Sequence, residues 1–253
     1  MTSPALASFG AGRLYVQNTD IVPATPREFG LLQSCDFDFS FSTKPIFGTN
    51  QFAAFVARGE AKWGMKAKSG LMSGGVINDI FFGQTLVAGQ TALQAVEAHT
   101  VPASSTYTIT PTAPSSGTFA SDQGVNYSNG MPLQLVASGP TVGQYSQSAG
   151  VYTFAAADAS AAVVISYTYT FTSAGQKVAI TNQPLGTTPF FSGVFRNRDP
   201  RSGLFTTLVI NRMTSSKLTL NSKTSDYEIP EFDCEIMDDG TGNIGTMSFG
   251  DLS

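Results

Sequence analysis

The sequence predicts a mainly β protein: a β-sandwich or half-barrel core with one short flanking helix, and a small β-sandwich domain inserted into that core. Two observations carry this prediction. Near both ends of the chain, apolar and polar residues alternate with a period of two, which fits a strand and not a helix of 3.6 residues per turn. The middle of the chain holds short strand-like runs separated by turn residues, as in a small sandwich.

The strands of the core are predicted from these flanks. In 35–42, one Cys and three Phe occupy the odd positions, and Asp and Ser occupy the even ones. Residues 60–68 repeat the alternation with a basic polar face, and 231–236 repeat it with an acidic one. Residues 204–210 and 217–220 are predicted as further strands.

One helix is predicted over residues 73–82. Its apolar residues at 76, 77, 80 and 81 have helical spacing, Ser73 is a suitable N-cap, and Gly83 suits the C-terminal end. A run this short needs a sheet to pack on. Residues 91–98 are a candidate for a second helical turn.

The inserted domain is predicted from a change in composition. No Lys or Arg occurs between Lys68 and Lys177, and from His99 onward this stretch is rich in Ser, Thr, Gly and Pro. Strands are expected at 107–110, 132–137, 151–154 and 163–171, with turn residues between them. We therefore expect a discontinuous core of residues 1–97 and 175–253, and an insertion at 98–174.

The charge content is the feature of the composition that restricts function most. Only 13% of the 253 residues are charged, about half of the usual 25%. With 19 Phe and 8 Tyr the chain is not disordered, and 14 basic against 18 acidic residues do not make a basic nucleic-acid-binding surface. A surface this poor in charge suits a protein that neighbours largely cover, and it also suits a secreted adhesin.

The cysteines and the N-terminus indicate where the chain is made. Cys35 and Cys234 lie far apart, on the apolar side of strand-like alternations, so we expect buried free thiols and assembly in a reducing cytoplasm. The N-terminal segment lacks the apolar region of a signal peptide. Since no run of eighteen apolar residues occurs, no transmembrane helix is expected.

Motifs for chemistry are weak, and we expect no enzyme, no cofactor and no metal. The single histidine, His99, sits at the predicted domain junction without a nucleophile motif. The bare G-x-G at 10–12 indicates a flexible turn, and the oxygen-rich 238–243 indicates an Asp-Gly turn rather than a Ca²⁺ loop. The sequon at Asn126 has meaning only in a secreted protein.

Charge placement is the remaining signal. The acidic residues at 231, 233 and 235 would project from one face of a strand, as would those at 36 and 38. One interpretation is a solvated outer face whose acids pair with lysines across strands. The other is an acidic surface that repels polyanions, so that a DNA duplex slides along it without adhering.

Several segments together carry a family resemblance. They are the opening 12–16 (GRLYV), the aromatic-acidic strand 35–42, the strand 59–68 that leads into the helix, and the closing 227–235 (YEIPEFDCE). On these segments the chain resembles the major tail tube proteins of tailed bacteriophages. The central segments 143–145, 150–154 and 165–169 resemble an Ig-like β-sandwich module of phage virion proteins.

The resemblance implies an assembly and a role. In this family six subunits form a ring, their inner sheets join into one β-barrel around a lumen, and rings stack into a tube that conducts the genome. It implies a structural protein of the virion tail, assembled in the host cytoplasm and not inserted into a membrane. Its partners would be further copies of itself, the tail terminator, the tape measure, distal tail or baseplate proteins, and transiently passing DNA. The insertion would lie on the outside of the tube.

The resemblance also assigns residues. Lumens in the family are typically acidic, which by position makes these the lumen-facing candidates: Asp36, Asp38, Glu231, Asp233 and Glu235. The lysines at 62, 66 and 68 (Lys62, Lys66 and Lys68) either share that face, which makes the lumen mixed in sign, or pair across subunits. The candidates for ring stacking are residues 1–12 and the loop 43–51, which reaches at most about 30 Å.

Two other functions remain open from the sequence. A virion decoration protein or adhesin would bind a host surface through 98–174, and it needs an exposed aromatic-polar patch, for which the candidates are Tyr145, Tyr152, Tyr167 and Tyr169. An enzyme, such as a polysaccharide-active β protein, needs two carboxylates that converge in a cleft.

Overall fold

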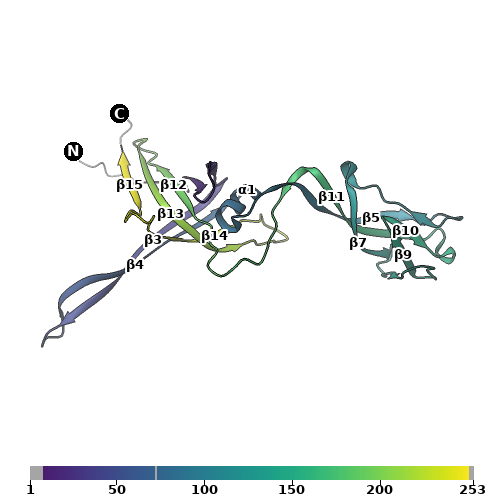
Figure 1. Cartoon of the computed structure of the whole chain (residues 1–253), viewed down its shortest axis with the longest axis horizontal. Coiled ribbons are helices and arrows are strands. Elements are labelled where there is room, and N and C mark those ends of the chain that lie inside the picture. The colour runs from purple at the N-terminus through teal and green to yellow at the C-terminus, as the bar shows by residue number, and fades with distance from the viewer. Residues whose placement is uncertain (1–7, 72, 251–253) are drawn as a thin grey trace. The chain divides into compact units, whose positions relative to one another are not determined.

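The computed structural model describes residues 8–71 and 73–250. It is mainly β, as predicted, with 54% of the described residues in strands and 6% in helices. The chain forms two compact units, one that combines the residues up to Leu86 with those from Val178 onward, and one that consists of Val87–Lys177 (Figure 1). We call the first unit the core unit and the second the insertion.

An eight-stranded sheet builds the core unit. Its strands follow the order β2-β1-β12-β13-β14-β4-β3, with β15 pairing along the first half of β13. Their bounds are β1 (Arg13–Asn18), β2 (Arg27–Glu28), β3 (Leu32–Phe47), β4 (Ala53–Ser69), β12 (Phe191–Arg198), β13 (Phe205–Thr219), β14 (Glu231–Ile236) and β15 (Gly245–Gly250). The two strands predicted at 204–210 and 217–220 are thus one strand, β13.

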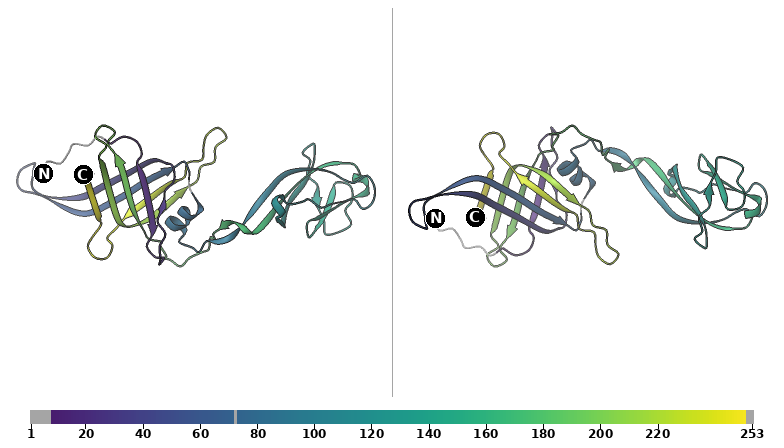
Figure 2. Two further views of the ribbon diagram at one scale, coloured as in Figure 1. Left: turned by 90° about the horizontal axis from the view of Figure 1, so that it is seen from above. Right: turned by 90° about the horizontal axis from the view of Figure 1, so that it is seen from below.

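The period-two alternation places one set of side chains in a single hydrophobic core. Met65, Phe232 and Met213, from β4, β14 and β13, are fully buried there. Phe37 of β3 meets Phe195 of β12 with ring centroids 5.3 Å apart. Because these strands are far apart in the sheet order, this contact shows that the sheet curves around its core as a half-barrel (Figure 2).

The helix lies where the sequence predicted it. It begins as α1 (Gly74–Ile77), with the Ser73 hydroxyl accepting a hydrogen bond from the Val76 amide at 3.3 Å. It continues as a π-helical turn over Asn78–Phe82 and ends at Gly83, whose φ of 60° is left-handed. Buried Val76 and Ile80 join the core. The Arg27 guanidinium fixes the turn through an ion pair to Asp79 at 2.6 Å.

The second helical turn, predicted at 91–98, is wrong. These residues belong to β5 (Val87–Thr100), which pairs antiparallel with β11 (Ala162–Lys177). A β-bulge at Val96, which has a φ of 59°, shifts the register between Ile165 and Tyr167. The extra residue breaks the alternation of apolar positions, which explains why the spacing resembled a helical turn.

The insertion is a small β-sandwich with its own core. One sheet has the order β5-β11-β7 and the other has the order β6-β10-β9-β8. The remaining strands are β6 (Thr108–Ile109), β7 (Thr118–Tyr127), β8 (Gln134–Leu135), β9 (Gln144–Ser148) and β10 (Val151–Phe154). Tyr152, Ile165 and Tyr167 are fully buried between them.

The insertion is wider than the predicted 98–174. Val87 and Lys177 are cross-strand partners at the start of a two-stranded ribbon formed by β5 and β11. The sequence-based boundary followed the change in composition, which comes later than the first backbone pairing. Both chain ends of the insertion therefore lie side by side, at the about 4.5–5.5 Å spacing of paired residues.

Every carboxylate of the insertion accepts a hydrogen bond from a tyrosine hydroxyl. Asp122 accepts from Tyr145 at 2.5 Å and from Tyr152 at 2.9 Å. Asp158 accepts from Tyr127 at 2.6 Å, and Glu97 accepts from Tyr167 at 2.8 Å. The three acidic residues of this stretch are therefore tied into its fold by hydrogen bonds.

This arrangement predicts that alkaline pH destabilises the insertion. Burial and the hydrogen bonds to Asp122 raise the pKa of Tyr145 and Tyr152 above the ordinary 10.0. The folded state therefore holds these hydroxyls neutral, so the stabilisation is complete below about pH 10 and is lost as the pH rises further, because the unfolded chain ionises first. Urea unfolding at a series of pH values should show a falling midpoint only above pH 10. The prediction would be contradicted if tyrosinate absorbance showed that all tyrosine hydroxyls ionise near pH 10 while the insertion stays folded.

Candidate functional site

The polar side of the core sheet carries a patterned set of charges, which we call the charged face. In the register of β3, β4, β14 and β13, Asp36 lies beside Lys66, Lys66 beside Asp233, and Asp233 beside Lys217. Cross-strand partners project to the same side of a sheet. The neighbours of Lys66 and Asp233 along their strands, Met65, Ala67, Phe232 and Cys234, are buried in the core on the other side. The charged face contains Asp36, Asp38, Lys62, Lys66, Lys68, Lys217, Glu231, Asp233 and Glu235.

All five lumen candidates thus share one face, and the three predicted lysines share it with them. The face is mixed in sign, with five carboxylates and four ammonium groups. Lys68 pairs with Glu231 at 3.2 Å, a half-exposed contact that contributes at most about 1 kcal/mol. A carboxylate-only row remains where Asp38 and Glu235 flank Gly64. A continuously acidic face is therefore not what the chain forms.

The strands that carry the charged face have open edges on both sides. Within the described residues, β3 pairs with β4 alone, and its other edge has no partner strand. The end of β13, from Thr214 to Thr219, pairs with β14 on one side, and β12 ends its pairing at Met213. Open edges present unpaired backbone N–H and C=O groups, which are a template for pairing with another chain.

A long hairpin extends from one end of this sheet. Beyond Phe41 and Arg58, β3 and β4 run on as a two-stranded ribbon that projects past the other strands (Figures 1 and 2). The prediction of a stacking loop at 43–51 is therefore wrong in part, because residues 43–47 belong to β3 and only a short turn follows them. Pro45 and the register shifts interrupt the alternation of apolar and polar residues there. The sequence pattern therefore predicted a loop instead of a strand.

The hairpin exposes large apolar side chains to solvent. Phe52 is 87% exposed, and Ile46, Phe47, Phe55 and Val56 are exposed to a similar degree. An isolated two-stranded hairpin is marginally stable in water, and contiguous exposed apolar surface marks an interaction site. We call these five residues the hairpin tip.

The other predicted stacking segment, residues 1–12, is only partly described. Residues 1–7 lie outside the described residues. Phe9 donates its amide to the Arg198 carbonyl at 3.4 Å, and its side chain is exposed. The described part of this segment therefore runs along the end of β12.

The residues weighed for chemistry have structural partners. His99 lies inside β5, not at a domain junction, and its Nε2 is 2.8 Å from the Glu97 carboxylate. In the 238–243 loop, the Asp238 carboxylate accepts the amides of Gly240 and Gly242. Hydrogen bonds from Thr241 lower the pKa of Asp239 to about 2, and hydrogen bonds from Asn211 and Asn243 contribute less to this shift. These carboxylates hold a turn together.

The two cysteines are free thiols on the core side of their strands. Cys234 is buried and Cys35 is half-buried. Burial raises the pKa of both thiols to about 12, so they stay protonated and unreactive at neutral pH. Among the helices that the structure describes, none is long and apolar enough to cross a membrane.

The tyrosines expected to form an adhesive patch are buried instead. Tyr145, Tyr152, Tyr167 and Tyr169 all point into the core of the insertion. The strand alternation that made them conspicuous is the alternation that turns them inward. These four candidates therefore do not form an exposed aromatic-polar patch.

No protein-family model matches the chain, and no curated protein matches it.

Proposed function

We propose that this chain is a structural subunit of a phage tail tube, with no catalytic role. Six copies form a ring, rings stack into a tube, and the charged face lines the channel through which DNA passes. Its partners are further copies of itself and other tail proteins, and it resides in the virion tail after assembly in the host cytoplasm.

One observation supports this proposal most strongly. Four neighbouring strands, β13, β14, β4 and β3, have one face covered by the core, one charged face and two open edges. Pairing the β3 edge of one copy with the Thr214–Thr219 edge of the next removes both open edges, and a closed ring of strands leaves none. The apolar faces would then point outward, toward the core of each subunit, and the charged faces inward.

The mixed signs of the charged face suit a conduit for DNA. A strongly basic wall would hold the phosphates by releasing counterions, and DNA would not slide. A wall with five carboxylates against four lysines per copy has a small net negative charge, which weakly repels the duplex. Alternating rows also neutralise one another locally, which limits repulsion between neighbouring copies in a ring.

Sedimentation velocity of the purified full chain tests the ring. We expect a species with a mass near six times the 26.6 kDa of the chain, together with larger stacks, whose share grows with protein concentration. High salt should weaken ring closure only modestly, because backbone pairing of strand edges does not depend on charge. A single 26.6 kDa species at every concentration and salt would contradict the proposal.

A further inference from the structure

Three arginines surround a pocket on the polar side of the core sheet, where β1 begins and β12 ends. The pocket has a volume of about 510 Å³. Its lining consists of Phe9, Gly12, Arg13, Arg196, Asn197, Arg198 and Phe205. Leu14 and Phe195, which are adjacent to two of the arginines in the sequence, pack in the hydrophobic core, so the arginines project away from it. We call Arg13, Arg196 and Arg198 the arginine cluster.

The arginine cluster holds positive charge that the fold leaves largely uncompensated. Arg13 and Arg196 are direct cross-strand partners, and like charges directly opposite each other destabilise a sheet. Among the described residues, the one ion pair of the cluster joins Arg13 to Glu28 at 3.8 Å, with both side chains well exposed. Three guanidinium groups against one carboxylate leave an excess of two positive charges in the pocket.

One aromatic ring positions two of the three guanidinium groups. The central carbon of the Arg196 guanidinium lies 3.4 Å from the centroid of the Phe205 ring, and that of Arg198 lies 6.0 Å from the same centroid. Such cation–π contacts hold a guanidinium in place, and stacking leaves the N–H groups in its plane available for an acceptor. The described residues supply neither of these two groups with an ion pair, so the pocket is ready for an anion.

The segment before β1 forms the wall opposite β12. The Phe9 amide donates a hydrogen bond to the Arg198 carbonyl at 3.4 Å, and the Asn197 side-chain amide donates one to the Gly10 carbonyl at 3.2 Å. These two hydrogen bonds hold the segment along β12. Because the Phe9 side chain is 83% exposed, it adds apolar surface beside the charged groups.

The combination of charge and apolar surface favours an acidic peptide over a nucleic acid. A guanidinium binds a carboxylate through two parallel hydrogen bonds, and the exposed Phe9 ring can contact an apolar side chain of the same peptide. Binding of DNA requires basic residues that follow a row of phosphates. Here the basic surface ends at Glu28 of β2, which pairs with Tyr15 of β1.

We propose that this pocket binds an acidic segment of a partner protein, in which carboxylates stand next to an aromatic or other apolar side chain. Bound carboxylates neutralise the arginine cluster and relieve the repulsion between Arg13 and Arg196. Phe37 of β3 and Phe195 of β12 meet across the core, so the polar sides of these two strands face in different directions. The pocket is therefore separate from the charged face, and the inference does not depend on the tube.

Fluorescence anisotropy of the full chain with a dye-labelled peptide tests this proposal. In the probe, three glutamates alternate with tyrosines, and the control probe has glutamines in place of the glutamates. We expect Arg196→Gln combined with Arg198→Gln to bind the acidic probe at least about tenfold more weakly than the unchanged chain, because two of three charge-assisted contacts are lost. Arg196→Lys should also weaken binding, since lysine keeps the charge and lacks the planar fork.

The matched control is Arg58→Gln. Arg58 also stacks on a phenylalanine, Phe41, at 4.6 Å from the ring centroid, and it lies outside the pocket. This variant should bind the acidic probe as the unchanged chain does. Urea unfolding checks the fold: Arg196→Gln removes a like-charge contact, so the unfolding midpoint should stay the same or rise.

Three results would overturn the proposal and leave the tube as it stands. They are equal affinity of the double variant and Arg58→Gln for the acidic probe, equal affinity of the unchanged chain for both probes, and a DNA duplex of about 20 base pairs that binds the cluster more tightly than the acidic probe. If the double variant misfolds, Arg13→Gln decides, because the Arg13 side chain is 70% exposed.

Discussion

Replacing Val87–Lys177 with a short Gly-Ser linker is expected to leave the remaining core folded and able to assemble. Val87 and Lys177 are cross-strand partners, so a few residues bridge the gap between Leu86 and Val178. The two units have separate hydrophobic cores. The entropic cost of closing a loop depends only weakly on its length, so replacing the insertion with a short linker changes this cost little. We expect the free energy of unfolding of the core unit to change by less than about 1 kcal/mol.

The insertion should also fold by itself when it is produced as residues 87–177. Circular dichroism and urea unfolding of both products measure this, and sedimentation tests whether the shortened chain still forms rings. An aggregated or unfolded core after excision would mean that the insertion is part of the folding unit. Rings that form only with the insertion present would assign it a role in assembly.

Reversing the carboxylate-only row of the charged face is expected to block the passage of DNA. Asp38→Lys and Glu235→Lys together turn five acids and four lysines per copy into three acids and six lysines. Gly64 lies between these two positions, so the new lysines meet no lysine in register and the fold is retained. The basic face would hold DNA by releasing counterions.

The measurements are tube assembly, salt-dependent DNA binding and infectivity of particles that carry the variant. We expect normal tubes, DNA binding that weakens with salt, and infectivity lowered at least tenfold. The matched control is Asp226→Lys with Glu228→Lys, which makes the same change in net charge in the loop before β14. Equal infectivity of the two double variants would contradict the proposal that the charged face lines a DNA channel.

The register also shows which reversal is a poor test. Changing Glu231, Asp233 and Glu235 together to Lys would place new lysines beside Lys66, Lys68 and Lys217. Like charges directly opposite each other destabilise a sheet. A loss of function in that variant would mix a folding defect with a transport defect.

The parts of the fold that follow a local rule could be predicted from the sequence. The alternation around Cys35 and Asp36 separates a core face from a polar face, and Ser73 and Gly83 limit the helix. These features depend on residues that are neighbours along the chain. The strands β7 and β9 were not predicted, because their segments are rich in Ser, Asp, Gln and Gly, and pairing with β11 and β10 makes them strands.

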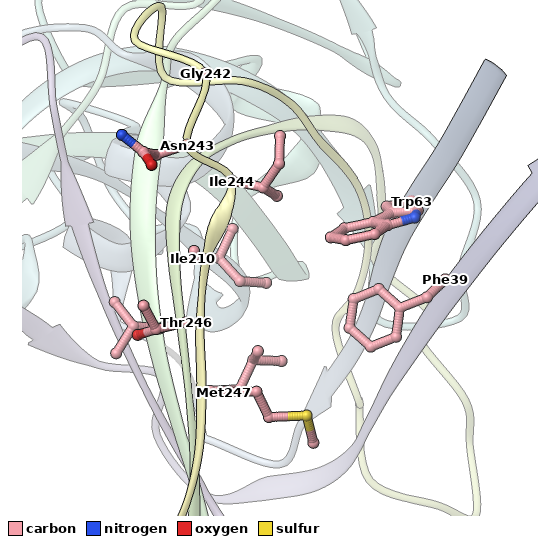
Figure 3. A pocket seen from close by; sticks show the side chains of 11 residues that line it. Phe39, Trp63, Ile210, Gly242, Asn243, Ile244, Thr246 and Met247 are labelled. Carbon is pink, nitrogen blue, oxygen red and sulfur yellow. The ribbon is translucent and has the colours of Figure 1, made fainter. Parts of the chain in front are cut away.

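The candidate site depends on the register in which the strands pair, and this register cannot be read from the sequence pattern. That Asp36, Lys66, Asp233 and Lys217 form one row follows only from the pairing of four strands. An apolar groove brings Trp63 and Met247 together through the curvature of the whole sheet (Figure 3). The length of the hairpin was hidden by Pro45 and by the register shifts of β3, which interrupt the alternation.

Negative-stain electron microscopy of the purified full chain at high concentration tests the tube most directly. We expect rings with a central channel, and stacks of such rings with a regular axial repeat. Uniform monomers without rings at any salt concentration would contradict the proposal that this chain is a tube subunit.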